Sequence, residues 1–450
     1  MRHSLGGFGS VDEVRVWRIE AADAERAQRC AAAALFAAGA TAGDRVLVSV
    51  RPSPGVVALA LGALRSGIVP VVVDPSLTEA ERGPIVDDAD AQIVVDSERA
   101  LDELLSGDDE RELAPVPLSR PMHYTSGTSG TPKGVWTGVL PDADATAMHD
   151  DEGETWSFSG DDVLLLASPL HHSAPLRFAS GVLLRGGSVV LVERFDAATV
   201  AAAIARYEPT VAFLVPSHLR RLFALPSMPS LSSFRLVAHA GEACEPALKQ
   251  RAIDAFPAGS VWEFYGSTEG QFTVCSPDEW LARPGTVGRA RRHRVMKADD
   301  DGQLWCTAPP WARFEYWRDP AKTAAAWGGD AFTVGDLGRV DGEGYVFLDG
   351  RRDDLIISGG VNVYPAEVEG VLASVDGVRM VGVFGVDDER WGQRVCAAYV
   401  GANATEDDLR AAAVARLAPH KRPKQYLRVD DLPRTSTGKL RRAALPSLLQ

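Results

Sequence analysis

The 450-residue sequence has few cysteines and lacks a long apolar run. Its cysteines are scattered, and no two have the close spacing of a zinc ribbon or a redox motif. Reduced thiols are therefore expected. The longest apolar stretches, VVALALGAL and IVPVVV, are far shorter than the ~20 residues that span a bilayer. The start, MRHSLGGFGS, has no apolar core of a signal peptide. We expect a cytoplasmic protein without a membrane partner.

The sequence also has fewer basic than acidic residues. Lys and Arg number 47 against 61 Asp and Glu, which gives a formal charge of −14. An acidic surface repels a phosphate backbone, so we expect no nucleic-acid partner. Basic residues gather only late, in HKRPKQYLRVDDLPRTSTGKLRR at 420–442. This run is either a solvated tail or a surface that faces phosphate.

The first half of the chain alternates β-branched runs with Ala-rich helical runs. RVLVSV at 45–50, IVPVVVD at 68–74 and DVLLLASP at 162–169 are typical of strands, and their alternation with helices predicts βαβ units in a mostly parallel sheet. From about Gly285, short strands separated by DDDG and DGEG predict hairpins.

The sequence contains no repeats, and a compact α+β segment follows Asp353. We predict an α/β protein with two domains. The large N-terminal domain, 1–352, has mixed and parallel sheets, packed helices and a β-rich subdomain. The small C-terminal domain, 353–450, is α+β.

A loop rich in glycine and hydroxyl residues gives the strongest functional signal. It reads YTSGTSGTPKG, from Tyr124 to Gly134. Glycines let backbone N–H groups turn toward an anion, the hydroxyls donate hydrogen bonds, and Lys133 supplies a charge. Lys133 is followed by glycine, not by Ser or Thr as in the Walker pattern, which disfavours a kinase or P-loop ATPase. A disordered linker would not need the Pro-Lys-Gly ending, so we predict phosphate binding.

This loop resembles the nucleotide loop of the acyl-adenylate-forming superfamily. That group includes acyl- and aryl-CoA synthetases, nonribosomal adenylation domains and luciferases. Further motifs follow in the family's order: FYGSTEG at 264–270, GDLG at 335–338, LIISGGVNVYPAEVE at 355–369 and PRTSTGKL at 433–440. The resemblance covers nearly the whole chain from Tyr124, and bacterial acyl-CoA synthetases are the most similar members.

The resemblance implies a nucleotide site. Its residues are Thr125, Ser126, Gly127, Thr128, Ser129, Gly130, Lys133, Gly241, Glu242, Tyr265, Gly266, Ser267, Asp336 and Arg351. Tyr265 offers a flat face for adenine, and Thr268 can bind the α-phosphate. The carboxylate of Glu269 suits Mg²⁺, and Asp336 can accept from both ribose hydroxyls. Glu242 departs from the small residue that the family often has.

The family also implies catalytic and mobile parts near the C-terminus. Lys439 matches the lysine that neutralises charge on the pentacovalent phosphate; alone it would be one more exposed lysine. Asp353 matches the hinge about which a mobile C-terminal domain rotates. Ser358, Gly359 and Gly360 match the turn beside the pantetheine tunnel.

An acid pocket is expected after the phosphate loop. In SPLHHSAPLR, at 168–177, His172 matches the family's gate and His171 precedes it, although a lone histidine is more often structural. Val261 and Trp262 are further candidates for this pocket. No aspartate can be assigned to an α-amino group, which weakens an amino-acid substrate. The region before Tyr124 is shorter than usual, which leaves the oligomeric state open, with a homodimer one option.

The motifs predict an AMP-forming acid–thiol ligase. It would convert a carboxylic acid to its acyl-AMP with ATP and Mg²⁺, release pyrophosphate, and form a thioester with CoA. His172, Thr268, Glu269 and Lys439 would be its catalytic residues. Three alternatives stay open: loading of a carrier-protein phosphopantetheine, diazotisation of an aryl amine with ATP and nitrite, and a nucleotide-binding module that has lost catalysis.

Overall fold

The chain folds into two compact units. The computed structural model describes residues 14–125, 132–351, 354–358, 361–388, 390–434 and 440–449. One unit comprises Met1–Val295 and Thr307–Phe332, and the second comprises Met296–Cys306 and Thr333–Gln450. The boundary predicted at 352/353 falls on residues outside the described part and stays a prediction.

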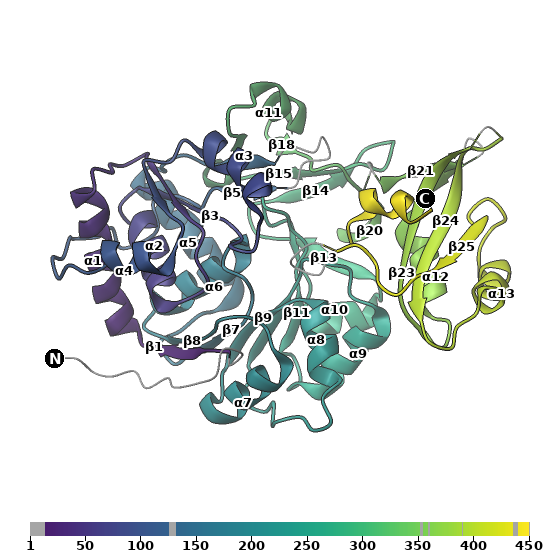
Figure 1. The fold of residues 1–450 in the computed structure, drawn as a ribbon, viewed down its shortest axis with the longest axis horizontal. Helices are drawn as coiled ribbons and strands as arrows, with labels where there is room; N and C mark the ends of the chain where they lie inside the picture. Colours follow the sequence, from purple (N-terminus) through teal and green to yellow (C-terminus); the bar gives the residue numbers. More distant parts are fainter. Residues whose placement is uncertain are drawn as a thin grey trace. The chain divides into compact units, whose positions relative to one another are not determined.

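A six-stranded sheet forms the centre of the first unit (Figure 1), with the order β1-β8-β7-β9-β10-β11. Its strands are β1 (Val16–Ile19), β7 (Val163–Leu166), β8 (Ser188–Val192), β9 (Val211–Leu214), β10 (Leu236–His239) and β11 (Val261–Glu263). All neighbours from β8 to β11 are parallel, and only β1 runs antiparallel, on β8. The predicted α/β alternation is thereby confirmed.

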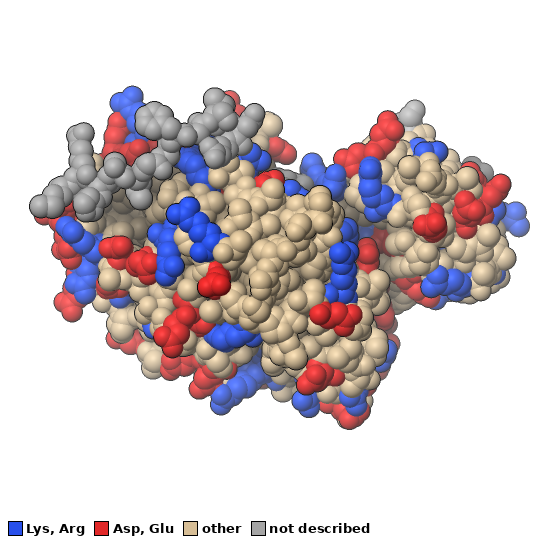
Figure 2. Space-filling view, turned by 90° about the horizontal axis from the view of Figure 1, so that it is seen from below, with Lys and Arg blue, Asp and Glu red and all other residues tan. Residues whose placement is uncertain are grey.

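Both faces of this sheet are covered, because successive side chains of a strand point to opposite faces. Leu165 and Val190 join one apolar cluster with three helices, α7 (Ala197–Tyr207), α8 (Pro216–Phe223) and α9 (Pro246–Ala255). Leu164 and Val189 join the other, with α6 (Ser173–Leu183) and α2 (Pro54–Leu64). Figure 2 looks toward the side of the α7–α9 layer and shows acidic and basic side chains interspersed there.

A smaller parallel sheet has the order β3-β2-β4. Its elements are β2 (Arg45–Val48), β3 (Val69–Val72) and β4 (Ile93–Val95), with the helices α1 (Ala21–Ala37), α3 (Glu79–Ala89) and α4 (Glu98–Leu104). Helix α2 packs closely on α1 at Gly62, where an added Cβ would lie 2.5 Å from the carbonyl oxygen of Gln28. Ser53 caps α2 and Pro54 occupies its first turn, which fixes where the helix begins.

The remaining elements of the first unit lie around the predicted motifs. They are β5 (His123–Thr125), β6 (Lys133–Trp136), α5 (Asp142–Trp156), β12 (Thr273–Val274), α10 (Pro277–Ala282), β13 (Thr286–Ala290), η1 (Pro310–Ala312), β16 (Glu315–Tyr316), α11 (Pro320–Ala326), β17 (Trp327–Gly328) and β18 (Ala331–Phe332). Strands β16, β6 and β5 form one antiparallel sheet in that order.

The second unit is α+β. Its elements are β14 (Val295–Ala298), β15 (Leu304–Thr307), β19 (Asp336–Val340), β20 (Tyr345–Arg351), β21 (Ile356–Ser358), β22 (Val361–Val363), α12 (Pro365–Ala373), β23 (Val378–Asp388), β24 (Gly392–Gly401), α13 (Glu406–Arg416), β25 (Gln425–Arg428) and η3 (Arg442–Leu449). Strands β22-β21-β24-β23 form a sheet, and β25 pairs with β24. Val368 of α12 and Leu409 of α13 are buried on one face, and Leu445 of η3 is buried in a second cluster.

Two further features concern the cysteines and the apolar helices. All five cysteines are free thiols, with no disulfide among them. In the part of the chain that the structure describes, no helix has both the length and the apolarity needed to cross a bilayer.

Candidate active site

The predicted phosphate loop connects the two strands of a hairpin. Tyr124 of β5 lies opposite Gly134 of β6, and Thr125 lies opposite Lys133. The ends of the loop are therefore held next to each other by the β-ladder. Of the predicted nucleotide ligands, Ser126, Gly127, Thr128, Ser129 and Gly130 lie outside the described residues. The Nζ of Lys133 lies 3.7 Å from Oδ2 of Asp319.

Side chains on both sides brace this hairpin. The Tyr124 hydroxyl donates to Oδ2 of Asp88 at 2.8 Å, and burial, followed by this bond, raises the pKa of Tyr124 above its usual range. The Trp317 indole donates to the carbonyl of Asp88 at 2.9 Å, and its backbone N–H donates to the carbonyl of Gly134 at 2.8 Å. A Cβ at Gly134 would lie 3.0 Å from Sδ of Met122, so the backbone approaches closely there.

The FYGSTEG segment forms a tight turn after β11. The N–H of Ser267 donates to the carbonyl of Gly270 at 2.7 Å, and the N–H of Phe272 donates to the carbonyl of Tyr265 at 2.9 Å. At Gly266 a Cβ would come within 2.8 Å of the carbonyl oxygen of Gly270, so glycine is needed for the turn. The ring of Tyr265 is largely buried and lies 4.7 Å from the ring of Phe272.

Two side chains join this turn to the phosphate-loop hairpin. Arg120 precedes β5, and its guanidinium donates to the carbonyls of Thr268 at 3.0 Å and Glu269 at 3.1 Å. Tyr316 lies on β16, opposite Val135 of β6, and its hydroxyl donates to Oε1 of Glu269 at 2.8 Å. Residues that are far apart in the sequence are thereby brought together as one site. Sequence analysis identified neither Arg120 nor Tyr316, because no local pattern marks them.

Glu242 has a structural partner. Gly241 has a φ of +95°, a left-handed conformation that favours glycine. The carboxylate of the following Glu242 accepts from the N–H of Ser217 at 2.5 Å, in the first turn of α8. An anionic acceptor satisfies an unpaired N–H of this helix and favours its positive end. This role accounts for a charged residue where the family often has a small one.

The two histidines lie where α6 begins. His172 is the residue before Ser173, the first residue of α6, and its ring lies 4.5 Å from that of His171. The Nε2 of His171 lies 3.8 Å from Oδ2 of Asp74, and burial lowers the pKa of His171. Among the other predicted pocket residues, Val261 is buried against the α7–α9 layer, and Trp262 packs on the opposite face of the sheet.

A cavity with about 910 Å³ of empty space, part of it open to solvent, lies within the first unit. Ser173, next to His172, and Gly270 and Gln271, next to Glu269, contribute to its wall. The end of α2, helices α5 and α6, the segment 117–123, residues after β13 and the short helix η1 complete it. The four predicted pocket residues, His171, His172, Val261 and Trp262, do not contribute to the wall of this cavity.

A buried carboxylate connects the walls of this cavity. Glu152 of α5 accepts from Nε of Arg177 at 2.9 Å and from the Trp156 indole at 2.7 Å. It also accepts from Gln271 at 3.2 Å and from Arg291 at 3.3 Å. Burial alone would raise the pKa of Glu152, but the charges of Arg177 and Arg291 lower it to about 2. Glu152 is therefore ionised at neutral pH.

In the second unit, the predicted ribose ligand has a basic partner. Asp336 of β19 lies opposite Arg351 of β20, and its Oδ1 is 3.2 Å from Nε of Arg351. Ser358, predicted in the thiol tunnel, is buried in β21. Asp353, Gly359, Gly360 and Lys439 lie outside the described residues. A β-bridge between Arg434 and Leu440 closes the base of the segment that carries Lys439.

Glu269 is the predicted metal ligand. Among the described residues no group of three or more His, Cys, Asp or Glu side chains is arranged to hold a metal ion. Glu269 itself is buried, and one of its two carboxylate oxygens binds Tyr316. A single carboxylate fits Mg²⁺, which binds through one or two carboxylates together with phosphates and water.

The chain is similar to known proteins over most of its length. Residues 18–122 and 120–307 match the AMP-binding enzyme family, and residues 367–439 match the AMP-binding enzyme C-terminal domain. A 2-succinylbenzoate–CoA ligase of a Geobacillus species is 33% identical over 351 residues, which cover 72% of this chain and 68% of that protein. The long-chain-fatty-acid–CoA ligase FadD13 of Mycobacterium tuberculosis is 30% identical over 472 residues, covering 93% of this chain and 90% of that protein.

Solved structures show the same fold. The o-succinylbenzoate CoA synthetase of Bacillus subtilis, in complex with its acyl-adenylate intermediate, superposes with a TM-score of 0.84 at 26% identity. That likeness covers 94% of this chain and 92% of the other. The predicted fold class, a large α/β part and a small C-terminal α+β part, is confirmed.

Proposed function

The chain belongs to the AMP-binding enzyme family of acyl-adenylate-forming enzymes, and we propose from this premise that it is an AMP-forming acid–thiol ligase. It activates a carboxylic acid with Mg²⁺ and ATP to an acyl-AMP, releases pyrophosphate, and transfers the acyl group to the thiol of CoA. The relatives that support this activity act on 2-succinylbenzoate and on long-chain fatty acids, as their names state. The two acids differ so much that the likeness alone does not identify the substrate.

One observation carries this proposal: Arg120 and Tyr316 hold the Thr268–Glu269 turn against the phosphate-loop hairpin. The side chain proposed for the α-phosphate and the carboxylate proposed for Mg²⁺ thus lie on one framework with Lys133. Catalysis of phosphoryl chemistry depends on such positioning of donors and cations.

The first half-reaction joins the acid to the nucleotide. A carboxylate oxygen of the acid attacks the α-phosphorus, a new O–P bond forms, and the bond to the pyrophosphate oxygen breaks. We propose that Thr268 donates to the α-phosphate and that Lys133 holds the phosphates. Mg²⁺, when bound at Glu269, neutralises phosphate charge. Lys439 neutralises the charge that grows on the phosphorus under attack, and His172 closes the acid pocket.

The second half-reaction uses the same acyl-AMP. The sulfur of the thiol attacks the acyl carbon, the acyl–phosphate bond breaks, and AMP leaves; the thiol proton passes to solvent. We propose that the domain 353–450 rotates about Asp353 relative to the domain 1–352. This rotation moves Lys439 out of the active site and brings the turn Ser358–Gly360 into it. Asp336 is proposed as the ribose acceptor, with Arg351 beside it. The other predicted nucleotide ligands stay proposals: Thr125 to Gly130, Gly241, Glu242, Tyr265, Gly266 and Ser267.

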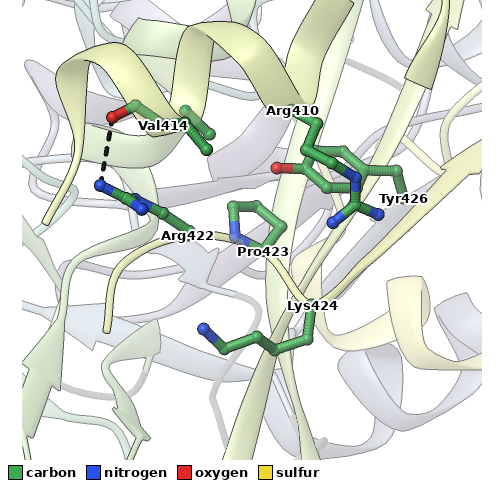
Figure 3. Close-up of a pocket in the computed structure, with 7 residues that line it drawn as sticks. Arg410, Val414, Arg422, Pro423, Lys424 and Tyr426 are labelled. Carbon is green, nitrogen blue, oxygen red and sulfur yellow. Dashed lines mark hydrogen bonds between the residues drawn. The ribbon is translucent and has the colours of Figure 1, made fainter. Parts of the chain in front are cut away.

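A carrier protein is the second candidate acceptor, and a basic hollow in the second unit favours it. Figure 3 shows Arg410, Arg422 and Lys424 around Pro423 and Tyr426. This hollow has about 490 Å³ of empty space, and Arg422 is fixed there by a hydrogen bond to the carbonyl of Val414 at 3.1 Å. A surface of this charge would attract an acidic carrier. We also propose a cytoplasmic location, because all five cysteines are free thiols.

Product analysis tests the function. The purified protein is incubated with ATP, Mg²⁺ and a panel of carboxylic acids, and AMP, ADP and pyrophosphate are measured with and without CoA. We expect acid-dependent pyrophosphate release and repeated turnover to AMP when CoA is present. Further reactions replace CoA with a phosphopantetheinylated carrier protein, or replace the acid with nitrite and an aryl amine. Formation of ADP, or turnover that needs no acid, would contradict the proposal.

A further inference from the structure

Positive charge exceeds negative charge in the wall of the cavity of the first unit. Four arginines and two carboxylates contribute to it: Arg120, Arg177, Arg291, Arg294, Asp151 and Glu152. Its two histidines add no charge at neutral pH, because burial lowers the pKa of His123 to about 3 and that of His149 to about 4. The cavity therefore repels an amine and attracts an anion.

The two carboxylates of the wall are shared among three of the four arginines, and Arg120 is the fourth. Arg291 and Arg294 both pair with Oδ2 of Asp151, at 3.3 and 3.0 Å. Glu152 is shared between Arg177 and Arg291. Among the described residues Arg120 has no carboxylate within ion-pair distance, and its guanidinium donates to the backbone carbonyls of Thr268 and Glu269.

The environment of Arg120 confirms that positive charge is crowded there. Burial, and then the neighbouring charges of Arg177 and Arg294, lower the pKa of Arg120 to about 10. Arg120 is still charged at neutral pH. A buried cation without a full counter-charge is costly unless an anionic ligand approaches it.

Buried hydrogen-bond donors without a partner belong to residues of the same wall. Nη2 of Arg177, Oγ of Ser180 and Nε1 of Trp311 are buried and have no hydrogen-bond partner among the described residues. All three residues contribute to the wall of the cavity. An apolar acyl chain would leave these donors unpaired, which is costly, whereas an anion would accept from them.

Helix α6 sets the distance between the donors of Arg177 and Ser180 and the carboxylate of the acid that reacts with ATP. Ser173, Arg177 and Ser180 lie on one face of α6, because residues four and three positions apart share a face. Ser173 adjoins the proposed gate His172. Arg177 and Ser180 lie roughly 6 and 10 Å farther along the helix axis, at 1.5 Å per residue. A ligand that reaches from His172 to Arg177 needs an anionic group at each end, because one end reacts with ATP and the other pairs with Arg177.

We propose that the acid activated by this enzyme carries a second carboxylate, which binds Arg177 in the cavity beside Arg120. The planar guanidinium fork matches a carboxylate better than a single cation would. Arg177 is a specificity-determining residue for this acid. The inference rests on the proposed function, because it identifies the class of acid that the ligase takes.

Substrate pairs that differ only in the second charge test the inference. Linear and aromatic dicarboxylic acids are compared with their monomethyl esters and with monocarboxylic acids of equal length, and kcat/KM is measured by pyrophosphate release. We expect the preferred diacid to exceed its monomethyl ester about 100-fold, because the ester leaves a buried charged donor unpaired. Preference for the esters or the monocarboxylic acids would overturn the inference and leave the ligase function intact.

Substitution of the arginine tests its assignment. Arg177→Met should lower the ratio of diacid to ester activity about 100-fold, and Arg177→Lys should restore part of it. Arg292→Met is the matched control, since Arg292 is exposed and pairs with Glu154 outside the cavity wall. Thermal unfolding midpoints establish that each variant is folded. Equal loss on both substrates would overturn the role of Arg177. If no acid supports pyrophosphate release, the proposed function itself fails.

Discussion

At the scale of single residues, the site depends on how one carboxylate is oriented. Glu269 is buried, and Tyr316 binds its Oε1. Among the described residues this is the only hydrogen bond to the Glu269 carboxylate, and Oε2 is the oxygen that we propose for Mg²⁺. Partners that orient a metal ligand affect affinity and activity nearly as much as the ligand does.

Tyr316→Phe removes only the hydroxyl. We expect pyrophosphate release to fall roughly 10-fold and the Mg²⁺ concentration for half-maximal rate to rise, because the carboxylate loses its orientation. The measurement is the initial rate over a Mg²⁺ titration at saturating acid. Tyr207→Phe, at the end of α7, is the control and should behave as the wild type. An unchanged Mg²⁺ dependence in Tyr316→Phe would separate Tyr316 from the metal site.

The sequence predicted some of these residues and missed others for a definite reason. Glu269 stands inside a motif whose residue types suggest their chemistry. Arg120 and Tyr316 act on that motif from positions far away in the chain, and nothing near either residue indicates a partner. The cap that Glu242 provides for α8 was also missed, because it depends on which helix the loop meets.

At the scale of elements, the predicted strands and helices of the first half are present. RVLVSV became β2 and DVLLLASP became β7, because runs of β-branched and apolar residues bounded by turns fit a buried parallel sheet. The two-residue strand β16 was not predicted. Its pairing with β6 comes from tertiary contact, since a pair of residues carries no periodicity of its own.

A buried cation joins helix α9 to the sheet that leads into the FYGSTEG turn. Lys249 is fully buried. Its Nζ lies 2.5 Å from Nε2 of His239 on β10 and 3.5 Å from Oε2 of Glu263 on β11. Burial lowers the pKa of His239 and raises that of Glu263. The charge of Lys249 offsets the cost of burying Glu263 immediately before the FYGSTEG turn.

Lys249→Met should lower the free energy of unfolding by about 3–5 kcal/mol, because it leaves a carboxylate buried without its counter-charge. Urea denaturation, followed through the transition in which the first unit unfolds, measures this change. The double variant Lys249→Met with Glu263→Gln should regain part of the loss, since the buried charge is then absent. Gln250→Met, exposed on the same helix, is the control. A loss as large in the double variant would show that packing, not charge, governs this site.

At the scale of the whole molecule, the sequence predicted two parts but placed the division by motif. In the structure, residues 296–306 belong to the second unit, and residues 307–332 belong to the first. Motif order cannot reveal such an exchange of segments, because compactness depends on contacts and not on adjacency in the chain. Residues 307–332 include Tyr316, so this segment supplies to the first unit the hydroxyl that binds Glu269.

The proposed division of labour between the two half-reactions rests on Lys439. Lys439→Ala should slow acyl-AMP formation about 100- to 1,000-fold, because it removes the cation that neutralises the phosphorus under attack. Thioester formation from a separately prepared acyl-AMP should change by less than about threefold, since the thiol attacks the acyl carbon in that step and not the phosphorus. Single-turnover assays of each half-reaction make the comparison.

Arg441→Ala is the matched control for Lys439→Ala. Arg441 is an exposed cation two positions away, so its removal tests whether general positive charge near the C-terminus is sufficient. We expect both half-reactions of Arg441→Ala to stay near the wild-type rate. If Lys439→Ala slowed both half-reactions equally, the lysine would serve the fold or a shared binding step. Wild-type acyl-AMP formation in that variant would remove Lys439 from the mechanism, and Lys133 and Mg²⁺ would be left as the proposed cations at the phosphates.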